Sequence, residues 1–312
     1  MAKEKVFVSA VVYVHNCQST IESYLKKLIS FFEDRFEHSE IILVNDHSTD
    51  NSAVIIRELG NQAANASVSL VNLSYFHGIE MAMSAGVDLS IGDHVFEFDN
   101  TNMDYSEDVI MQVFNKELEG FDIVSASSDR PIKFSSKVFY RLFSRYSNYS
   151  NNALQTESFR VLSRRVINRI GNMNKTVPYR KAVFAYSGLK ATNIKYSSLA
   201  SAKIKTTRQE RKMRFELAVD SLLLFTNVGF RFSLFMSVFM LVMMVAVTLY
   251  TLIAYIVIHP VEGWTSTLLF LTMAFFGIFA VMAIVIKYLQ LILEMVFKRH
   301  QYCFESIEKL ND

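Results

Sequence analysis

The chain has 312 residues, and its 32 Lys and Arg against 30 Asp and Glu give a formal net charge of +2. This balance argues against a nucleic-acid-binding protein, which is usually far more basic. The only two cysteines, Cys17 and Cys303, are distant in the sequence, so a structural disulfide is not expected. The length accommodates one domain of about 230 residues and a further segment.

From Val6 to Ala126 the chain alternates between apolar, β-branched runs and segments with helical spacing. The runs that predict strands are Val6–Val14, Glu40–Val44, Ser67–Leu73, Asp93–Phe98 and Phe121–Ala126. The segments that predict helices are residues 19–36, Ala53–Leu59, Gly78–Leu89 and Glu107–Leu118. Strands and helices that alternate in this way indicate an α/β fold, with a mostly parallel sheet and helices on both faces.

Four polar residues follow the predicted strands closely: Asn16, Asp46, Asp99 and Asp104. Parallel sheets of this kind bind ligands at the carboxyl ends of their strands. These four side chains are therefore candidate substrate-binding residues, although the fold pattern alone names no substrate.

The segment 134–147 (FSSKVFYRLFSRYS) has one apolar face and one basic face at helical pitch. Such a helix suits the headgroup region of a bilayer, and the alternative is an ordinary surface helix packed on the sheet. A similar mixture of apolar and basic residues recurs in residues 206–231. We expect an interfacial helix in the first segment and a juxtamembrane amphipathic segment in the second.

Two long apolar runs follow. Residues 232–261 and residues 264–286 contain no Lys, Arg, Asp or Glu. A helix needs about 20 apolar residues to cross the hydrocarbon core of a bilayer, and each run exceeds that length. The sequence therefore predicts a two-helix transmembrane hairpin. The alternative is a buried helical hairpin inside a large soluble core.

The charges that flank the two runs predict their orientation. Basic residues precede the first run and follow the second, at Arg208, Arg211, Lys212, Arg214, Arg231, Lys287, Lys298 and Arg299. The connecting loop carries only the acidic Glu262. The positive-inside rule then places both ends of the hairpin in the cytoplasm. We therefore expect residues 1–205 to form a cytoplasmic domain at the inner membrane, and residues 287–312 to form a cytoplasmic tail.

Six stretches carry a resemblance to a known family. They are VVYVHN at 11–16, VNDHSTDNS at 44–52, LSYFHGIEMAMSAG at 73–86, FDNTNMDYSED at 98–108, ESFRVLSRR at 157–165 and GWTS at 263–266. In order and spacing they resemble family-2 glycosyltransferases of GT-A fold, in the branch of polyprenyl-phosphate sugar transferases. That branch includes dolichyl-phosphate mannose synthase and undecaprenyl-phosphate glucosyltransferases. The resemblance implies a GT-A (Rossmann-like) domain followed by interfacial amphipathic helices and the transmembrane hairpin.

The resemblance also implies roles for single residues. Asp46 matches the acid that receives the nucleotide base, although a helix-capping aspartate would fit the same position. Asp99 matches the first acid of a D-x-D pair that holds Mg²⁺ or Mn²⁺ against the donor diphosphate. Arg160 matches an arginine that can grip a phosphate, and Lys212 matches a lysine close to the lipid phosphate. The expected catalytic residues are Asp99, Arg160 and Lys212, and the expected substrate-binding residues are Asn16, Asp46, Asp99, Asp104 and Arg160.

Three positions depart from the family pattern. Thr101 stands where the D-x-D pair has its second acid, Ser158 stands where an acid precedes Phe-Arg, and Asn45 stands where the family has Asp. A neutral hydroxyl is a much poorer metal ligand than a carboxylate. We therefore expect Asp99 to bind a metal ion only weakly.

The leading expectation is an inverting membrane glycosyltransferase that moves a sugar from a nucleotide-sugar to a polyprenyl phosphate, specifically undecaprenyl phosphate in a bacterial inner membrane. The second pKa of a phosphate monoester is about 6, so this acceptor needs a general base less than a sugar hydroxyl does. The alternative, favoured by Asn45, Thr101 and Ser158, is a catalytically impaired relative that acts as a membrane scaffold or partner. The expected partners are the nucleotide-sugar, the polyprenyl phosphate and the lipid bilayer, with homo-oligomers left open.

Overall fold

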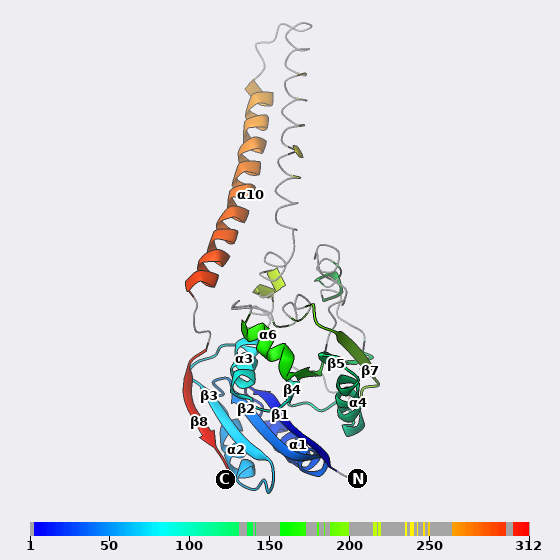
Figure 1. The fold of residues 1–312 in the computed structure, drawn as a ribbon. Coiled ribbons are helices and arrows are strands. Elements are labelled where there is room, and N and C mark those ends of the chain that lie inside the picture. Colours follow the sequence, from blue (N-terminus) through cyan, green and yellow to red (C-terminus); the bar gives the residue numbers. More distant parts are fainter. Residues whose placement is uncertain are drawn as a thin grey trace.

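The computed structural model describes residues 3–130, 157–172, 188–199, 264–297 and 302–311, together with isolated positions between these ranges. Within these residues, eight strands join into one sheet in the order β7-β5-β6-β4-β1-β2-β3-β8. Helices cover both faces of the sheet, and the long helix α10 projects away from it (Figure 1).

The elements follow the predicted order closely. The strands are β1 (Glu4–Val14), β2 (Phe36–Asn45), β3 (Ser67–Leu73), β4 (His94–Phe98), β5 (Ile123–Ser128), β6 (Phe159–Ser163), β7 (Ala191–Tyr196) and β8 (Phe304–Lys309). The helices are α1 (Gln18–Arg35), α2 (Ser52–Gly60), α3 (Ile79–Leu89), α4 (Glu107–Leu118), α6 (Arg164–Asn172) and α10 (Trp264–Phe297). The prediction of β1–β5 and α1–α4 is confirmed. The largest difference is at β2, which begins at the buried Phe36 rather than at Glu40.

Strand β1 lies in the middle of the sheet and pairs in parallel with β2 and β4. Its residues from Val8 to Val14 are almost all buried, as expected for a strand that is covered on both faces. The β2–β3 and β5–β7 pairs are also parallel. Strand β6 is antiparallel to β4 and β5, and β8 is antiparallel to β3. The prediction of a mostly parallel sheet is therefore confirmed.

Alternate residues of β1 face two separate hydrophobic cores. Val8 and Val12 pack with the buried faces of α1, α2 and α4, whereas Val11 packs with α3 on the opposite face. Gly86 allows α3 to lie close to the sheet, because a Cβ atom at this position would sit 2.4 Å from Val11 Cγ1. This close packing holds Glu80, in the first turn of α3, on the same face of the sheet as Val11.

The C-terminal strand β8 forms the edge of the sheet beside β3 (Figure 1). The prediction of a tail over residues 287–312 is therefore wrong for residues 304–309, which belong to the sheet. Arg57 of α2 donates two hydrogen bonds to Glu308, with Nε–Oε2 at 2.7 Å and Nη2–Oε1 at 3.0 Å. Leu310 packs over Gly60 of α2, where a side chain would collide with it. The short, polar sequence of β8 explains why its pattern does not predict a strand.

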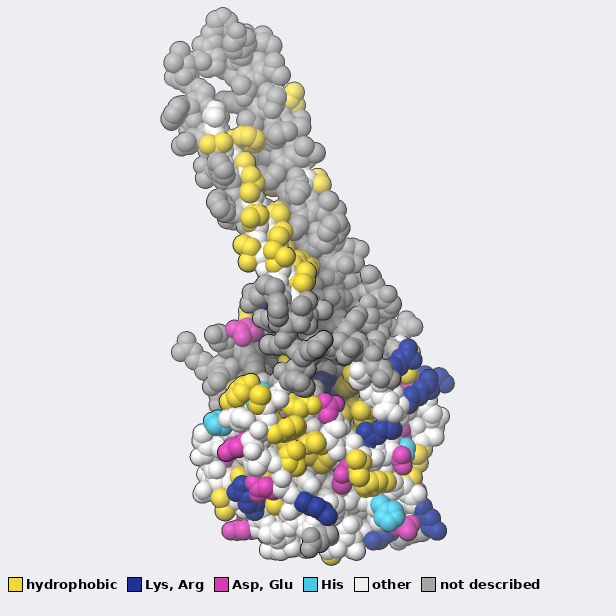
Figure 2. Space-filling model, turned by 60° about the vertical axis from the view of Figure 1, so that its left-hand side comes forward, with side chains coloured by type: hydrophobic (Ala, Val, Ile, Leu, Met, Phe, Trp, Pro, Cys, Tyr) yellow, Lys and Arg dark blue, Asp and Glu magenta, His cyan; other side chains and the backbone are white. Residues whose placement is uncertain are grey.

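Helix α10 contains the second predicted membrane run. It carries exposed apolar side chains at Leu271, Ile278, Met282 and Val285, and Figure 2 shows hydrophobic surface along the projecting part of the molecule. Measured on the described residues alone, no helix reaches the length and hydropathy of a membrane span. The predicted run 232–261 and the segments 134–147 and 206–231 lie outside the described residues, apart from isolated positions.

Candidate functional site

A cluster of charged side chains lies at the carboxyl end of β4. This strand is parallel to β1 on one side and antiparallel to β6 on the other. The members of the cluster are Glu80, Glu97, Asp99, Glu157, Arg160 and Arg180. Arg160 and Glu97 are 0% and 1% exposed, although groups of this kind are almost never fully buried without partners. Four carboxylates surround two guanidinium groups, so the cluster keeps an excess of negative charge.

Arg160 is placed by the antiparallel pairing of β4 and β6. In this register Glu97 lies directly opposite Arg160, and the two side chains share one face of the sheet. Nε of Arg160 lies 3.3 Å from Oε2 of Glu97 and 3.3 Å from Oε2 of Glu157, while Nη2 lies 3.1 Å from Oδ2 of Asp99. Asp99 and Arg160, both predicted from the sequence as catalytic residues, are therefore in contact.

Arg180 completes the cluster from the region between α6 and β7. Its Nη1 lies 2.7 Å from Oε1 of Glu97, and its Nη2 lies 3.0 Å from Oδ1 of Asp99. Its Nε and its backbone N–H both donate to Oε2 of Glu80, at 3.1 and 2.9 Å. Sequence reasoning missed this residue, because an isolated arginine outside any motif carries no local signal for the site.

The carboxylates keep both arginines charged in spite of their burial. Burial by itself lowers the pKa of the Arg160 guanidinium, but the charges of Glu157, Asp99 and Glu97 outweigh it and raise this pKa above the usual range. For Arg180, burial again lowers the pKa, and Glu97, Glu80 and Asp99 raise it further than burial lowers it. The site therefore presents two permanent positive charges beside Asp99.

The residues around Asp99 do not fit a divalent metal ion in this arrangement. Oδ1 and Oδ2 of Asp99 each accept a guanidinium N–H, from Arg180 and Arg160 respectively. The hydroxyl of Thr101 lies 2.7 Å from that of Thr20, in the first turn of α1. In the part of the chain that the structure describes, no group of three or more His, Cys, Asp or Glu side chains is arranged to hold a metal.

Asp46 is fully buried and is bonded within the protein. Its Oδ1 accepts the backbone N–H of His77 at 2.7 Å, and its Oδ2 accepts the backbone N–H of Gly78 at 2.8 Å. The hydroxyl of Tyr13 donates to Oδ2 at 3.0 Å. Asp46 thus holds the loop that leads into α3, and its predicted contact with a nucleotide base remains a prediction.

The loops after β1 and β2 contain two left-handed residues that are not glycine. Asn16 has a φ of 47° and His47 has a φ of 54°, a region in which such residues are uncommon and strained. The side-chain Oδ1 of Asn16 accepts the backbone N–H of Thr49 at 2.8 Å, which ties the two loops together. Strained backbone at the carboxyl ends of two neighbouring strands is consistent with a binding edge there.

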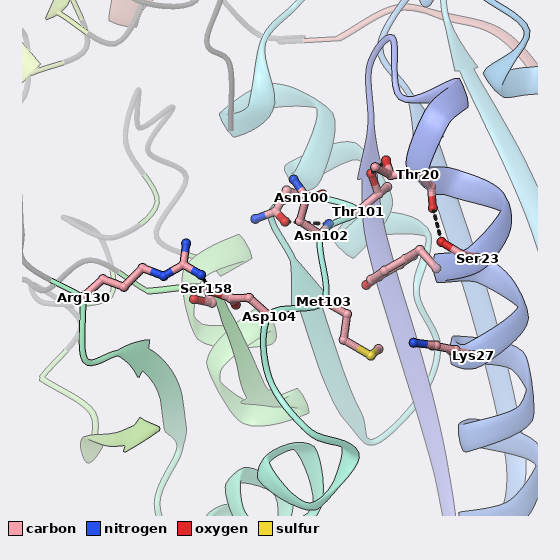
Figure 3. Close-up of a pocket in the computed structure, with 11 residues that line it drawn as sticks. Thr20, Ser23, Lys27, Asn100, Thr101, Asn102, Met103, Asp104, Arg130 and Ser158 are labelled. Atoms are coloured by element: carbon pink, nitrogen blue, oxygen red, sulfur yellow. Dashed lines mark hydrogen bonds and ion pairs between the residues drawn. The ribbon is translucent and has the colours of Figure 1, made fainter. Parts of the chain in front are cut away.

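A cavity of about 250 Å³ opens between α1 and the loop that follows β4. Figure 3 shows Arg130, Asp104 and Ser158 at one end, and Lys27 at the other. The remaining lining side chains are mostly hydroxyls and amides, from Thr20, Ser23, Tyr24, Asn100, Thr101, Asn102 and Met103. At one end Nη2 of Arg130 lies 3.7 Å from Oδ2 of Asp104, so this lining of hydroxyls, amides and paired charges suits a hydroxylated ligand.

The Asp104 end of the cavity is held by a hydrogen-bond network. The hydroxyl of Tyr196 lies 2.8 Å from Oδ1 of Asp104 and 2.5 Å from the hydroxyl of Ser158, and the hydroxyl of Ser198 donates to Oδ2 of Asp104 at 2.9 Å. Burial and the Asp104 carboxylate raise the pKa of Tyr196, so its hydroxyl keeps its proton. Asp104 therefore sits in the cavity wall, where a substrate-binding role stays open. Lys212 lies outside the described residues.

Residues 9–174 match the sequence model of the family described as glycosyl transferase family 2. This range spans the charged cluster apart from Arg180. Over 191 residues the chain is 29% identical to an uncharacterized glycosyltransferase of Synechocystis sp., and the match covers 59% of each chain. Over 197 residues it is 30% identical to a prophage bactoprenol glucosyl transferase homolog of Escherichia coli, covering 61% of this chain and 62% of that protein. The match thus spans about three fifths of these relatives.

A similar fold occurs in the solved structure of glucosyl-3-phosphoglycerate synthase from Mycobacterium tuberculosis, in complex with Mn²⁺, uridine diphosphate and glucosyl-3-phosphoglycerate. The TM-score is 0.54 and the sequence identity is 15%, with 70% of this chain and 79% of that chain covered. At this identity the likeness concerns the fold, and it supports the GT-A arrangement of the sheet and helices.

Proposed function

Because this chain belongs to glycosyl transferase family 2, we propose that it transfers a sugar from a nucleotide-sugar to a polyprenyl phosphate. The family match over residues 9–174 is the observation that carries the proposal, because it includes β1, β2, β4 and β6 and the strand ends that would receive a donor. The acceptor is suggested by the name of the Escherichia coli relative, which is a bactoprenol glucosyl transferase homolog.

The donor would lie across the carboxyl ends of β1, β2 and β4, near Asn16, Asp46 and Asp99. The reaction breaks the bond between the anomeric carbon and the diphosphate, and a phosphate oxygen of the acceptor forms a bond to the same carbon with inversion. The leaving diphosphate needs positive charge. Arg160 and Arg180, which both contact Asp99, would supply this charge by exchanging a carboxylate partner for the diphosphate.

No carboxylate is required to deprotonate the acceptor in this scheme. A phosphate monoester has a second pKa of about 6 and is largely dianionic at neutral pH. The hydroxyl of Ser158, where the family has an acid, is engaged with Tyr196 at the edge of the cavity. A neutral residue at this position agrees with an acceptor that carries its own negative charge.

Residues 232–261 and 264–286 would anchor the enzyme as a hairpin in the inner membrane. Part of the support is their freedom from charged residues and the exposed apolar side chains of α10. The position of β8 adds a second argument: β8 follows α10 in the chain, yet it pairs with β3 of the N-terminal sheet. The chain between β3 and β8 must therefore cross a membrane an even number of times. Two spans meet this condition and keep the active site cytoplasmic.

The direct test incubates the full-length protein with undecaprenyl phosphate and a panel of nucleotide-sugars, and detects the sugar-phospholipid by mass spectrometry. We expect one donor to give product and Asp99→Asn to lower the rate by roughly 100-fold, the usual cost of losing a charged group at the reacting centre. Asp108→Asn, at an exposed position in the first turn of α4, is the matched control and should leave the rate unchanged.

A second candidate function is a catalytically silent membrane partner. It is favoured by the state of Asp99, whose two carboxylate oxygens are both occupied by arginines, and by the hydroxyl residues Thr101 and Ser158. Absence of product with every donor, together with retained nucleotide binding, would favour this role over the enzyme.

A further inference from the structure

Asp99 is contacted by two arginines whose backbones lie in different parts of the fold. Arg160 belongs to β6, whose backbone is paired with β4 on one side and β5 on the other, and its side chain is 1% exposed. Arg180 lies outside the strands of the sheet and its side chain is 8% exposed. Of the two guanidinium groups, that of Arg180 is the one that can leave Asp99 without disrupting the sheet.

We infer that the guanidinium of Arg180 is the resident cation of the Asp99 site, and that a divalent metal ion binds to Asp99 only by displacing it. The inference rests on the proposed function, since it concerns the cation that faces the donor diphosphate. Where a D-x-D pair has both acids, a metal ion supplies the positive charge. Here Thr101 replaces the second acid, and the guanidinium of Arg180 supplies that charge instead. Arg180, which lies outside the six stretches of resemblance, thus joins the residues that control the site.

Geometry and charge both support competition rather than joint occupancy. Nη2 of Arg180 lies 3.0 Å from Oδ1 of Asp99, so a metal ion on that oxygen would have to occupy nearly the same space. Two positive charges a few ångströms apart also repel each other. The same guanidinium holds Oε1 of Glu97 at 2.7 Å and Oε2 of Glu80 at 3.1 Å. The binding free energy of a metal ion at Asp99 must therefore exceed that of the contacts between Arg180 and three carboxylates.

Once Arg180 is removed, the negative charge of the remaining carboxylates favours binding of a metal ion. Without Arg180, Glu80, Glu97 and Asp99 lose a shared partner, while Arg160 keeps its contacts with Glu97 and Asp99. Carboxylate oxygens are suitable ligands for Mg²⁺ and Mn²⁺. Substitution of Arg180 should thus create a metal site where the native chain has a weak one.

The test measures Mn²⁺ binding to the full-length protein by electron paramagnetic resonance, without any sugar donor. In the native protein we expect weak binding, which Asp99→Asn weakens further. In Arg180→Met we expect Mn²⁺ affinity to rise about tenfold or more, since a hydrogen bond to a charged group is worth roughly that factor. Adding Asp99→Asn to Arg180→Met should abolish the gain. Arg57→Met, which removes an arginine paired with Glu308 far from the cluster, should bind Mn²⁺ like the native protein.

Two results would overturn the inference. One is tight Mn²⁺ binding by the native protein that Asp99→Asn removes, and the other is unchanged or weaker binding by Arg180→Met. If Arg180→Met does not fold, Arg180→Lys decides, because lysine keeps the charge but cannot bridge three carboxylates and should raise Mn²⁺ affinity to a smaller extent. Mn²⁺ binding is measured apart from sugar transfer, so a failed transfer assay would count against the proposed function and leave the competition unaffected.

Discussion

Glu97 and Arg160 face each other across the antiparallel β4–β6 pair, with Oε2 of Glu97 3.3 Å from Nε of Arg160. Both side chains are 1% exposed, so neither charge can be compensated by water. The two residues lie 63 positions apart in the sequence. Their contact fixes the geometry of the cluster, because Asp99 follows Glu97 by two residues and thereby reaches the same guanidinium group.

Arg160→Met should destabilise the fold. Removing one partner of a buried ion pair leaves an uncompensated charge, which costs about 3–5 kcal/mol. The free energy of unfolding, measured by denaturant titration, is expected to fall by that amount. Arg165→Met provides the comparison, since the Arg165 side chain is 70% exposed and lies 3.8 Å from Asp122. Equal effects of the two substitutions would contradict the assigned burial of Arg160.

His47→Gly should stabilise the protein. The backbone of His47 has a φ of 54°, which a glycine adopts without steric cost, and its side chain is exposed. Relief of this strain is worth about 1 kcal/mol, reduced by the greater freedom of glycine in the unfolded chain. Thermal unfolding checks the sign. His38→Gly, at an exposed position within β2, should instead lower the melting temperature, because glycine weakens a strand.

Glu308→Gln should lower stability at neutral pH and not at acidic pH. The hydrogen bonds from Arg57 are the main cause that lowers the pKa of Glu308 in the folded protein. A depressed pKa in the folded state means that the contribution is present above the usual pKa of a glutamate and is lost as pH falls through the folded value. The pair is largely exposed, so the difference at pH 7 should stay below about 1 kcal/mol.

The comparison of Glu308→Gln with the native protein is made by urea unfolding at pH 7 and at pH 3. Hydrogen exchange of the β8 amides should show the same trend, since β8 is held to α2 by this pair. A larger difference at pH 3 than at pH 7 would reverse the assigned sign.

Asp46→Asn should loosen the loop before α3. The carboxylate accepts two backbone N–H groups and one hydroxyl, and an amide cannot accept all three equally well. A buried donor left unsatisfied costs about 1–3 kcal/mol. Calorimetric titration with uridine diphosphate and guanosine diphosphate then separates two roles. A loss confined to one nucleotide indicates base contact, whereas an equal loss for both indicates that Asp46 positions the loop.

The orientation of the predicted hairpin can be checked by cysteine labelling in intact cells. A cysteine at Glu262, in the connecting loop, should react with an impermeant reagent from outside. A cysteine at Lys309, an exposed residue of β8, should react only after permeabilisation. Labelling with the opposite sidedness would separate the active site from cytosolic nucleotide-sugars.

The sequence by itself determined the order of β1–β5 and α1–α4, and the resemblance of its motifs indicated the GT-A class of fold. These features are encoded locally: the β-branched runs of β1 to β5 and the helical spacing between them are patterns of a few residues. The D-x-D remnant at Asp99 and the Phe-Arg of β6 are equally local. Each can be recognised without knowing what lies next to it in space.

Only the tertiary structure decided which charges meet. Arg180 lies 81 positions from Asp99 and outside any motif, and it reaches Asp99 because the fold returns the chain to β4. Asp46 looks like a ligand-binding acid in sequence, yet the loop before α3 folds over it and uses its carboxylate. The six residues of β8 pair with β3 from the far end of the chain. Contacts at such separations depend on packing that no short pattern records.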